Sequence, residues 1–192
     1  LSEPDGGAAQ IVPPDEGRVK AGRVTFAGEG GKMAGYLAGP ANATGRLPAV
    51  IVIHENRGLV PHIQDVTRRM ALEGFLALGP DFLHQSGGTP TDEDQGRTMI
   101  GKLEQARTVA NATASLRFLK AHAASNGKVG ATGFCWGGST TNFLAAAAGA
   151  DLIAAAPYYG AQPPAADVPR IKARLMLHYA ENDANINKGI PD

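Results

Sequence analysis

The sequence has one cysteine, no surplus of either charge and no long apolar run. A lone Cys135 among 192 residues excludes an internal disulfide framework and a multi-cysteine metal site. Lysine and arginine total 18, as do aspartate and glutamate, so no basic excess indicates a nucleic-acid partner. Because no apolar run reaches the roughly 18 residues that a membrane span requires, we expect no membrane partner.

Composition divides the chain into a short arm and one domain. Residues 1–22 are rich in proline, glycine and acidic residues, which predicts an irregular arm on the surface. Residues 23–192 are long enough for a single domain with a sizeable core. The sequence does not determine the cellular compartment, which is either the cytoplasm or a location reached by export with removal of a signal peptide.

The apolar pattern beyond residue 23 predicts alternating strands and helices. A hairpin is expected around Gly28–Gly31, and strands are expected at 49–53, 75–78, about 128–133, 152–159 and 175–179. Helical periodicity covers 61–73, 91–119 with a possible break near Gly101, and 140–148. Because residues 49–53 are continuously apolar, that strand should be covered on both faces. The expected fold is α/β, a mainly parallel twisted sheet with helices on both faces.

Glycines surround Cys135 at the junction of an expected strand and helix. Gly133, Gly137 and Gly138 stand at −2, +2 and +3 from the cysteine. The pattern glycine–x–nucleophile–x–glycine is typical of a strained elbow that exposes a nucleophile above a sheet. A sulfur at a helix N-terminus is favoured as thiolate. The alternative is an ordinary buried thiol, since free cysteine is among the most buried residue types.

Two further polar clusters follow expected strands. His54-Glu55-Asn56-Arg57 comes directly after the strand at 49–53, and Asn182-Asp183 follows the strand at 175–179. The carboxyl ends of parallel strands share one edge of a sheet, where open α/β sheets place their sites. We therefore expect these two clusters to converge with Cys135.

Four segments in this order resemble the dienelactone hydrolase (carboxymethylenebutenolidase) family, the Cys-nucleophile branch of the α/β hydrolases. They are H-E-N-R-G-L at 54–59, G-F-C-W-G-G at 133–138, P-Y-Y-G at 157–160 and E-N-D at 181–183. The resemblance runs from about Arg23 to the end of the chain. It implies an α/β-hydrolase fold, hydrolysis of a small ester or lactone through an acyl-thioester, and no metal or organic cofactor.

The resemblance also implies a role for each matching residue. Cys135 is the expected nucleophile, and Asp183 orients the catalytic histidine. The backbone N–H groups of Trp136 and Asn56 form the oxyanion hole. Glu55 contacts the thiol and assists its ionisation.

Each assignment has a plainer structural alternative. Glu55 could form an ion pair with Arg57, and Asp183 could be a turn residue. Arg57 could bind a substrate carboxylate or remain a solvated charge. Tyr159 could line the substrate pocket or serve in aromatic packing. His54 and His178 fall within or at the ends of buried strands, where a hydrogen-bonded core histidine is the expectation.

The sequence departs from the family in two respects. All five histidines precede Asp183, and no further strand and helix follow it. We expect either a continuation past Asp192 or a second fragment that carries the histidine; the alternative is a non-catalytic ligand-binding or interaction protein on the same fold. In addition, the loop at 81–85 has no arginine where the family's lactone hydrolases hold the substrate carboxylate, so the substrate should differ from dienelactone.

Overall fold

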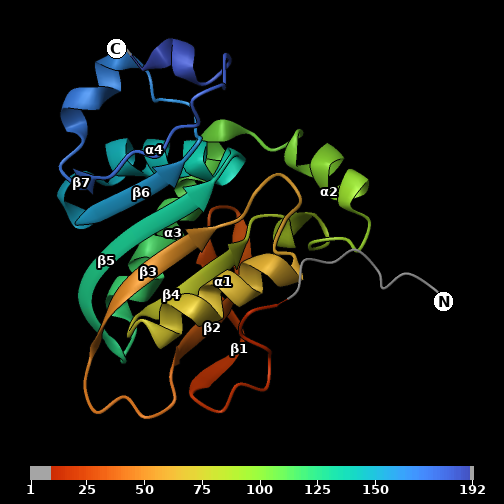
Figure 1. Ribbon diagram of the computed structural model, residues 1–192, viewed down its shortest axis with the longest axis vertical. Coiled ribbons are helices and arrows are strands. Elements are labelled where there is room, and N and C mark those ends of the chain that lie inside the picture. Colours follow the sequence, from red (N-terminus) through yellow and green to blue (C-terminus); the bar gives the residue numbers. More distant parts are fainter. Residues whose placement is uncertain (1–9, 191–192) are drawn as a thin grey trace.

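The computed structural model describes residues 10–190 and contains one seven-stranded sheet (Figure 1). The strands, in chain order, are β1 (Val19–Gly28), β2 (Gly31–Pro40), β3 (Leu47–Ile53), β4 (Leu76–Asp81), β5 (Ser125–Phe134), β6 (Ala154–Tyr158) and β7 (Arg174–Leu175). Their spatial order is β1-β2-β4-β3-β5-β6-β7. β1 and β2 form the expected hairpin, β2 also pairs antiparallel with β4, and all other pairs are parallel.

Helices cover both faces of this sheet. α1 (Pro61–Leu72) packs on β2, β4 and β3, whereas α3 (Gln105–Ala121) and α4 (Trp136–Ala148) pack against β5 on the opposite face (Figure 1). α2 (Glu93–Ile100) lies beyond the sheet edge, and the side chain of Asp92 caps it by accepting from two backbone N–H groups. The expected mainly parallel, two-sided α/β architecture is therefore confirmed.

The central strand β3 explains why its apolar run is continuous. Ile51 and Ile53 join the core under α3 and α4, while Val50 and Val52 join the core under α1. Successive side chains of a strand point to opposite faces, so a strand with helices on both faces needs apolar residues at every position. β3 thus contributes side chains to both cores, and its carboxyl end lies at the edge of the sheet where the polar clusters follow the strands.

Several element boundaries differ from the expectations. β1 begins at Val19, four residues before the expected boundary, because Val19 to Gly22 pair with the far end of β2. The break near Gly101 is confirmed, because residues 101–104 separate α2 from α3. α4 begins at Trp136 rather than residue 140. β7 has only two residues, extended by an isolated bridge between Tyr158 and His178.

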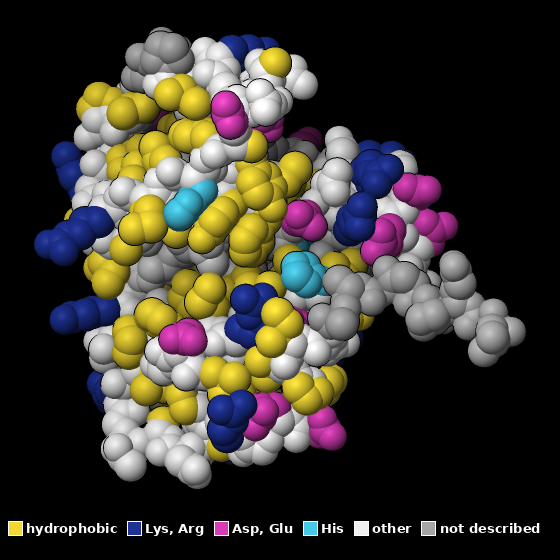
Figure 2. All heavy atoms as spheres, in the orientation of Figure 1, with side chains coloured by type: hydrophobic (Ala, Val, Ile, Leu, Met, Phe, Trp, Pro, Cys, Tyr) yellow, Lys and Arg dark blue, Asp and Glu magenta, His cyan; other side chains and the backbone are white. Residues whose placement is uncertain are grey.

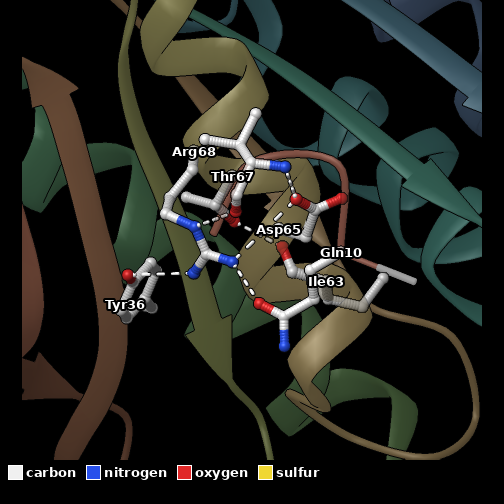
Figure 3. A network of polar contacts seen from close by, with 7 residues as sticks. Gln10, Tyr36, Ile63, Asp65, Thr67 and Arg68 are labelled. Atoms are coloured by element: carbon white, nitrogen blue, oxygen red, sulfur yellow. Dashed lines mark hydrogen bonds and ion pairs between the residues drawn. The ribbon is translucent and has the colours of Figure 1, made fainter. Parts of the chain in front are cut away.

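The described part of the arm is fixed to the domain by a buried polar network (Figure 3). Arg68 of α1 donates from Nε to the carbonyl of Val12 at 2.7 Å and from Nη2 to Gln10 at 2.6 Å. Asp65 accepts the N–H of Val12 at 2.6 Å. Val12 is buried, whereas Gln10 and Ile11 are exposed, so this irregular segment lies on the surface and is anchored to the domain at Val12. Residues 1–9 of the predicted arm fall outside the described residues.

Apolar side chains remain exposed beside β6 and β7. Met176 is 65% exposed, Leu177 47% and Ile153 45%, and Figure 2 shows hydrophobic side chains gathered over this part of the sheet. In residues 10–190, only the short 3-10 turn at Asn187–Gly189 follows β7 as helical structure. None of the described helices has the length and apolar character needed to cross a bilayer.

Candidate active site

Cys135 occupies a sharp turn between β5 and α4. Its φ is 55° and its ψ −113°, a backbone conformation that is strained for a side chain with a Cβ. The Cys135 N–H donates to the carbonyl of Tyr158 at 3.1 Å, which anchors the turn to β6. The residue is exposed, so the alternative of an ordinary buried thiol is wrong.

Two glycines, Gly133 and Gly137, allow α4 to begin directly against the strand ends. A Cβ on Gly133 would collide with the backbone of Gly137, and a Cβ on Gly137 would collide with the carbonyls of Ile53 and His54. The first turn of α4 therefore touches the carboxyl end of β3. This contact brings the polar cluster that starts at His54 next to the elbow, as the sheet topology predicts.

The turn after β6 closes the other side of the site. A Cβ on Gly160 would meet the backbone of Gly138 and Ser139, and Ser139 Oγ accepts the N–H of Ala161 at 2.8 Å. Tyr159 has φ 39°, in the left-handed region that non-glycine residues rarely adopt. The side chain of Tyr159 is partly buried.

The pKa of Tyr159 responds to Glu55 and Cys135. Partial burial raises the pKa of the Tyr159 hydroxyl, and the negative charges of Glu55 and Cys135 raise it further. Glu55 is half-buried and also interacts with the Tyr159 hydroxyl. The arrangement gives a phenol that stays protonated and can donate a hydrogen bond within the site.

Arg57 does not pair with Glu55. Its guanidinium forms an ion pair with Glu93 of α2 at 2.7 Å, with the Arg57 side chain 41% exposed. The ion-pair alternative for Glu55 is therefore wrong, and Arg57 pairs instead with a residue of α2. An exposed pair of this kind contributes only about 0–1 kcal/mol, so the guanidinium can exchange partners easily.

The two histidines at strand ends, His54 and His178, differ in their hydrogen bonding. His54 is buried, with Nδ1 2.6 Å from the carbonyl of Glu55 and Nε2 3.3 Å from the N–H of Phe82. Burial lowers its pKa, against weaker opposing effects of the Glu55 carbonyl and the Asp81 charge. His54 is thus the hydrogen-bonded core histidine that was expected. His178 stacks on Tyr158 at 4.2 Å, but its Nε2 is buried without a partner among the described residues.

Asp183 sits in the loop after β7 and caps its own turn. Its Oδ1 accepts the N–H of Asn185 at 3.2 Å and that of Ile186 at 3.1 Å. Within the described residues, its hydrogen bonds go to this turn and not to the Cys135 elbow. The turn alternative therefore describes what Asp183 does here, while its orienting role remains a prediction.

Asp81 and Thr89 are two structural residues of the site that the sequence argument missed. Asp81 is buried and accepts from the N–H of Leu83 at 3.0 Å and the hydroxyl of Thr89 at 2.8 Å. Thr89 Oγ1 in turn accepts the N–H of Leu59 at 2.8 Å. This chain ties the loop after β4 to the loop after β3. The available signal was an aspartate at the end of a strand, ahead of a Gly-Gly-Thr segment.

Comparisons with known proteins agree with this geometry. The dienelactone hydrolase family matches residues 33–190. An Escherichia coli K12 protein, provisionally named as a carboxymethylenebutenolidase, is 36% identical over 157 residues, which cover 80% of this chain and 57% of that protein. The chain thus spans little more than half of this curated relative.

Solved structures show the same similarity in three dimensions. A protein named m3DLH is 29% identical with a TM-score of 0.78, covering 91% of this chain and 75% of its own. The dienelactone hydrolase-like promiscuous phosphotriesterase P91, from metagenomic libraries, is 29% identical with a TM-score of 0.76, covering 91% of this chain and 76% of its own.

Proposed function

Because the chain belongs to the dienelactone hydrolase family, we propose that it contributes the nucleophile of a hydrolase acting on small esters or lactones. The observation that carries this proposal is the exposed Cys135 at φ 55° between β5 and α4. A strained turn of this kind presents a side chain above the sheet edge. The α4 helix of 13 residues starts at the next position, and its N-terminal partial charge favours the thiolate.

In the first step, the Cys135 sulfur attacks the carbonyl carbon of the ester. A carbon–sulfur bond forms, and the carbonyl π electrons move onto oxygen to give a tetrahedral oxyanion. The N–H of Trp136 is available for this oxyanion, because the first N–H of a helix has no intrahelical partner. The N–H of Asn56, from the loop after β3, is the second donor. The proximity of these two segments rests on the contact of Gly137 with the end of β3.

Collapse of the oxyanion breaks the carbon–oxygen bond to the leaving alcohol. The alcohol departs with a proton, and the acyl group remains on Cys135 as a thioester. Water then attacks the thioester, releasing the carboxylic acid and restoring the thiol. The phenol of Tyr159, whose pKa is raised by burial and by nearby negative charge, stays protonated and donates to a substrate oxygen in both steps.

Asp183 is proposed to orient a catalytic imidazole, a role assigned to none of the five histidines in residues 1–192. This imidazole takes the thiol proton when Cys135 attacks and gives it to the leaving alcohol, then takes a proton from the attacking water and returns it to the Cys135 sulfur. The N–H groups of Asn185 and Ile186 donate to Oδ1, so Oδ2 is the oxygen proposed to accept from the imidazole. His54 is not that base, because both of its ring nitrogens are bonded to backbone groups. Glu55 is proposed to affect the ionisation of the Cys135 thiol. The support is that Glu55 and Cys135 both raise the pKa of the Tyr159 hydroxyl.

The substrate class is proposed from the charge of Arg57 and from the loop at 81–85. Arg57 is proposed to bind a substrate carboxylate by exchanging its exposed partner Glu93. The loop at 81–85 offers no arginine for that purpose, which favours esters other than dienelactone. The likeness to a promiscuous phosphotriesterase makes a phosphotriester a second electrophile worth testing on Cys135.

The test compares wild type with Cys135→Ala on p-nitrophenyl acetate and on a p-nitrophenyl phosphotriester. The proposal predicts that the variant loses Cys135-dependent p-nitrophenol release while keeping its fold by circular dichroism. Loss on both electrophiles places both reactions on the same sulfur. Equal rates for wild type and variant would refute the proposal and favour the non-catalytic ligand-binding alternative.

A further inference from the structure

His54 is a buried polar group that the mechanism above leaves without a role. The residue lies at the carboxyl end of β3 and is fully enclosed. Its two ring nitrogens reach two different chain segments, the carbonyl of Glu55 at 2.6 Å and the N–H of Phe82 at 3.3 Å. An imidazole that bridges two backbone groups costs more to bury than an apolar side chain, so its presence calls for a functional explanation.

The bond to Glu55 fixes a peptide plane rather than a single carbonyl. The carbonyl of Glu55 and the N–H of Asn56 belong to the same planar peptide unit, where they point in opposite directions. A donor held against the Glu55 oxygen therefore sets the direction of the Asn56 N–H. That N–H is the oxyanion donor proposed from the loop after β3.

The tautomer needed for this bond is fixed by the second contact. Nε2 accepts from the N–H of Phe82, so it carries no proton, and Nδ1 must carry the single proton of a neutral ring. Burial lowers the pKa of His54, which keeps the ring neutral. The same ring lies parallel to the indole of Trp136, with 5.3 Å between centroids and 10° between planes. Phe82 meets both rings edge-on.

We propose that His54 is a positioning residue that aligns both oxyanion-hole donors, Asn56 through the Glu55 carbonyl and Trp136 through ring stacking. This inference rests on the proposed function, in which Cys135 is acylated. It assigns the imidazole to holding a peptide plane and not to transferring a proton. It also explains why an aromatic residue follows the nucleophile: its ring rests on His54 while its N–H faces the site.

Three substitutions separate the contributions of this ring. His54→Asn places an amide N–H near the position of Nδ1 and can keep the bond to Glu55. His54→Gln places an amide oxygen near Nε2 and keeps the acceptor for Phe82 but not the donor for Glu55. His54→Phe keeps a ring against Trp136 and loses both hydrogen bonds.

The experiment measures two reactions of the same sulfur in each variant. Single-turnover acetylation of Cys135 by p-nitrophenyl acetate depends on the oxyanion hole, whereas alkylation by iodoacetamide has no oxyanion. Loss of one oxyanion donor typically costs about 100-fold to 1000-fold, so a misaligned donor should cost roughly 10-fold to 100-fold. The proposal predicts the largest loss of acetylation rate for His54→Gln, which keeps neither the donor for Glu55 nor the ring against Trp136. Smaller losses are expected for His54→Asn, which keeps the donor, and for His54→Phe, which keeps the ring, while alkylation rates stay within about twofold throughout.

The outcomes separate the two proposals. Equal acetylation in the Asn and Gln variants, or parallel loss of acetylation and alkylation, would overturn the positioning role and leave a purely structural histidine. If His54→Phe does not fold, the comparison of Asn with Gln decides alone. Acetylation that proceeds unchanged in Cys135→Ala would overturn the proposed function itself, and the role of His54 with it.

Discussion

The buried network around Arg68 offers a sharp test of how the arm is held. Arg68 and Asp65 are both 1% exposed, and Arg68 makes hydrogen bonds to Val12, Tyr36 and Gln10 (Figure 3). The change considered is Arg68→Met, which keeps the volume and removes the charge and every donor. It leaves the Asp65 carboxylate buried beside a single backbone partner, the N–H of Val12.

The expected cost follows from that stranded carboxylate. Removing one member of a buried ion pair destabilises a protein by about 3–5 kcal/mol, because the remaining charge is uncompensated. This is a large share of the roughly 5–15 kcal/mol that stabilises a typical domain. Adding Asp65→Asn removes the charge and keeps an oxygen for Val12, so the double variant should recover a substantial part of the loss.

Urea unfolding followed by circular dichroism measures these differences. The control is Arg97→Met, since Arg97 and Asp94 form the same i,i+3 pair on α2 with side chains 53% and 85% exposed. The exposed pair should cost no more than about 0.5 kcal/mol. A cost for Arg68→Met equal to that of Arg97→Met would refute the reasoning, as would a double variant less stable than Arg68→Met alone.

Three further predictions concern the site. Burial lowers the pKa of His54 below its ordinary 6.5, so the unfolded state takes up the proton at a higher pH than the folded state does. The free energy of unfolding should therefore fall as the pH drops through about 6.5, by up to ~1.4 kcal/mol per pH unit. The urea midpoint of His54→Asn, measured across the same pH range, should fall less than that of wild type. Gly160→Ala forces a Cβ onto the backbone of Gly138 and should cost about 1–3 kcal/mol, whereas Gly22→Ala meets nothing and should stay near neutral by the same assay. Burial is the largest cause of the raised pKa of Tyr159, and the charge of Glu55 is the next. Glu55→Gln removes that charge, so ultraviolet titration should show a lower pKa for Tyr159. An unchanged titration would mean that Glu55 does not act on the Tyr159 hydroxyl.

The sequence predicts the sheet and the elbow because both depend on local patterns. Continuous apolar residues at 49–53 require a strand covered on both faces, and β3 indeed supplies both cores. Glycines around Cys135 predict a close approach of strand and helix, which the packing of Gly133 and Gly137 confirms. Turn and strand chemistry of this kind is encoded within a few residues.

What the sequence leaves out depends on long-range contacts. From the sequence alone, Arg68 is indistinguishable from an ordinary helix residue. Only the fold brings it into contact with Gln10 and Val12, which lie more than fifty positions away. The pairing of Arg57 with Glu93 is also non-local, whereas the sequence suggests only the nearby Glu55 as a partner. Side-chain partners across such distances are set by the topology and not by the spacing along the chain.

The central claim is that the Cys135 sulfur carries the acyl group. The direct measurement is an intact mass of the protein quenched by acid during reaction with p-nitrophenyl acetate, followed by peptide mapping. The account predicts one acetyl group, on the peptide that contains Cys135, absent in Cys135→Ala and removed by hydroxylamine at neutral pH as a thioester requires. An acetyl group found on a lysine or tyrosine, or on the Cys135→Ala protein at the same rate, would contradict it.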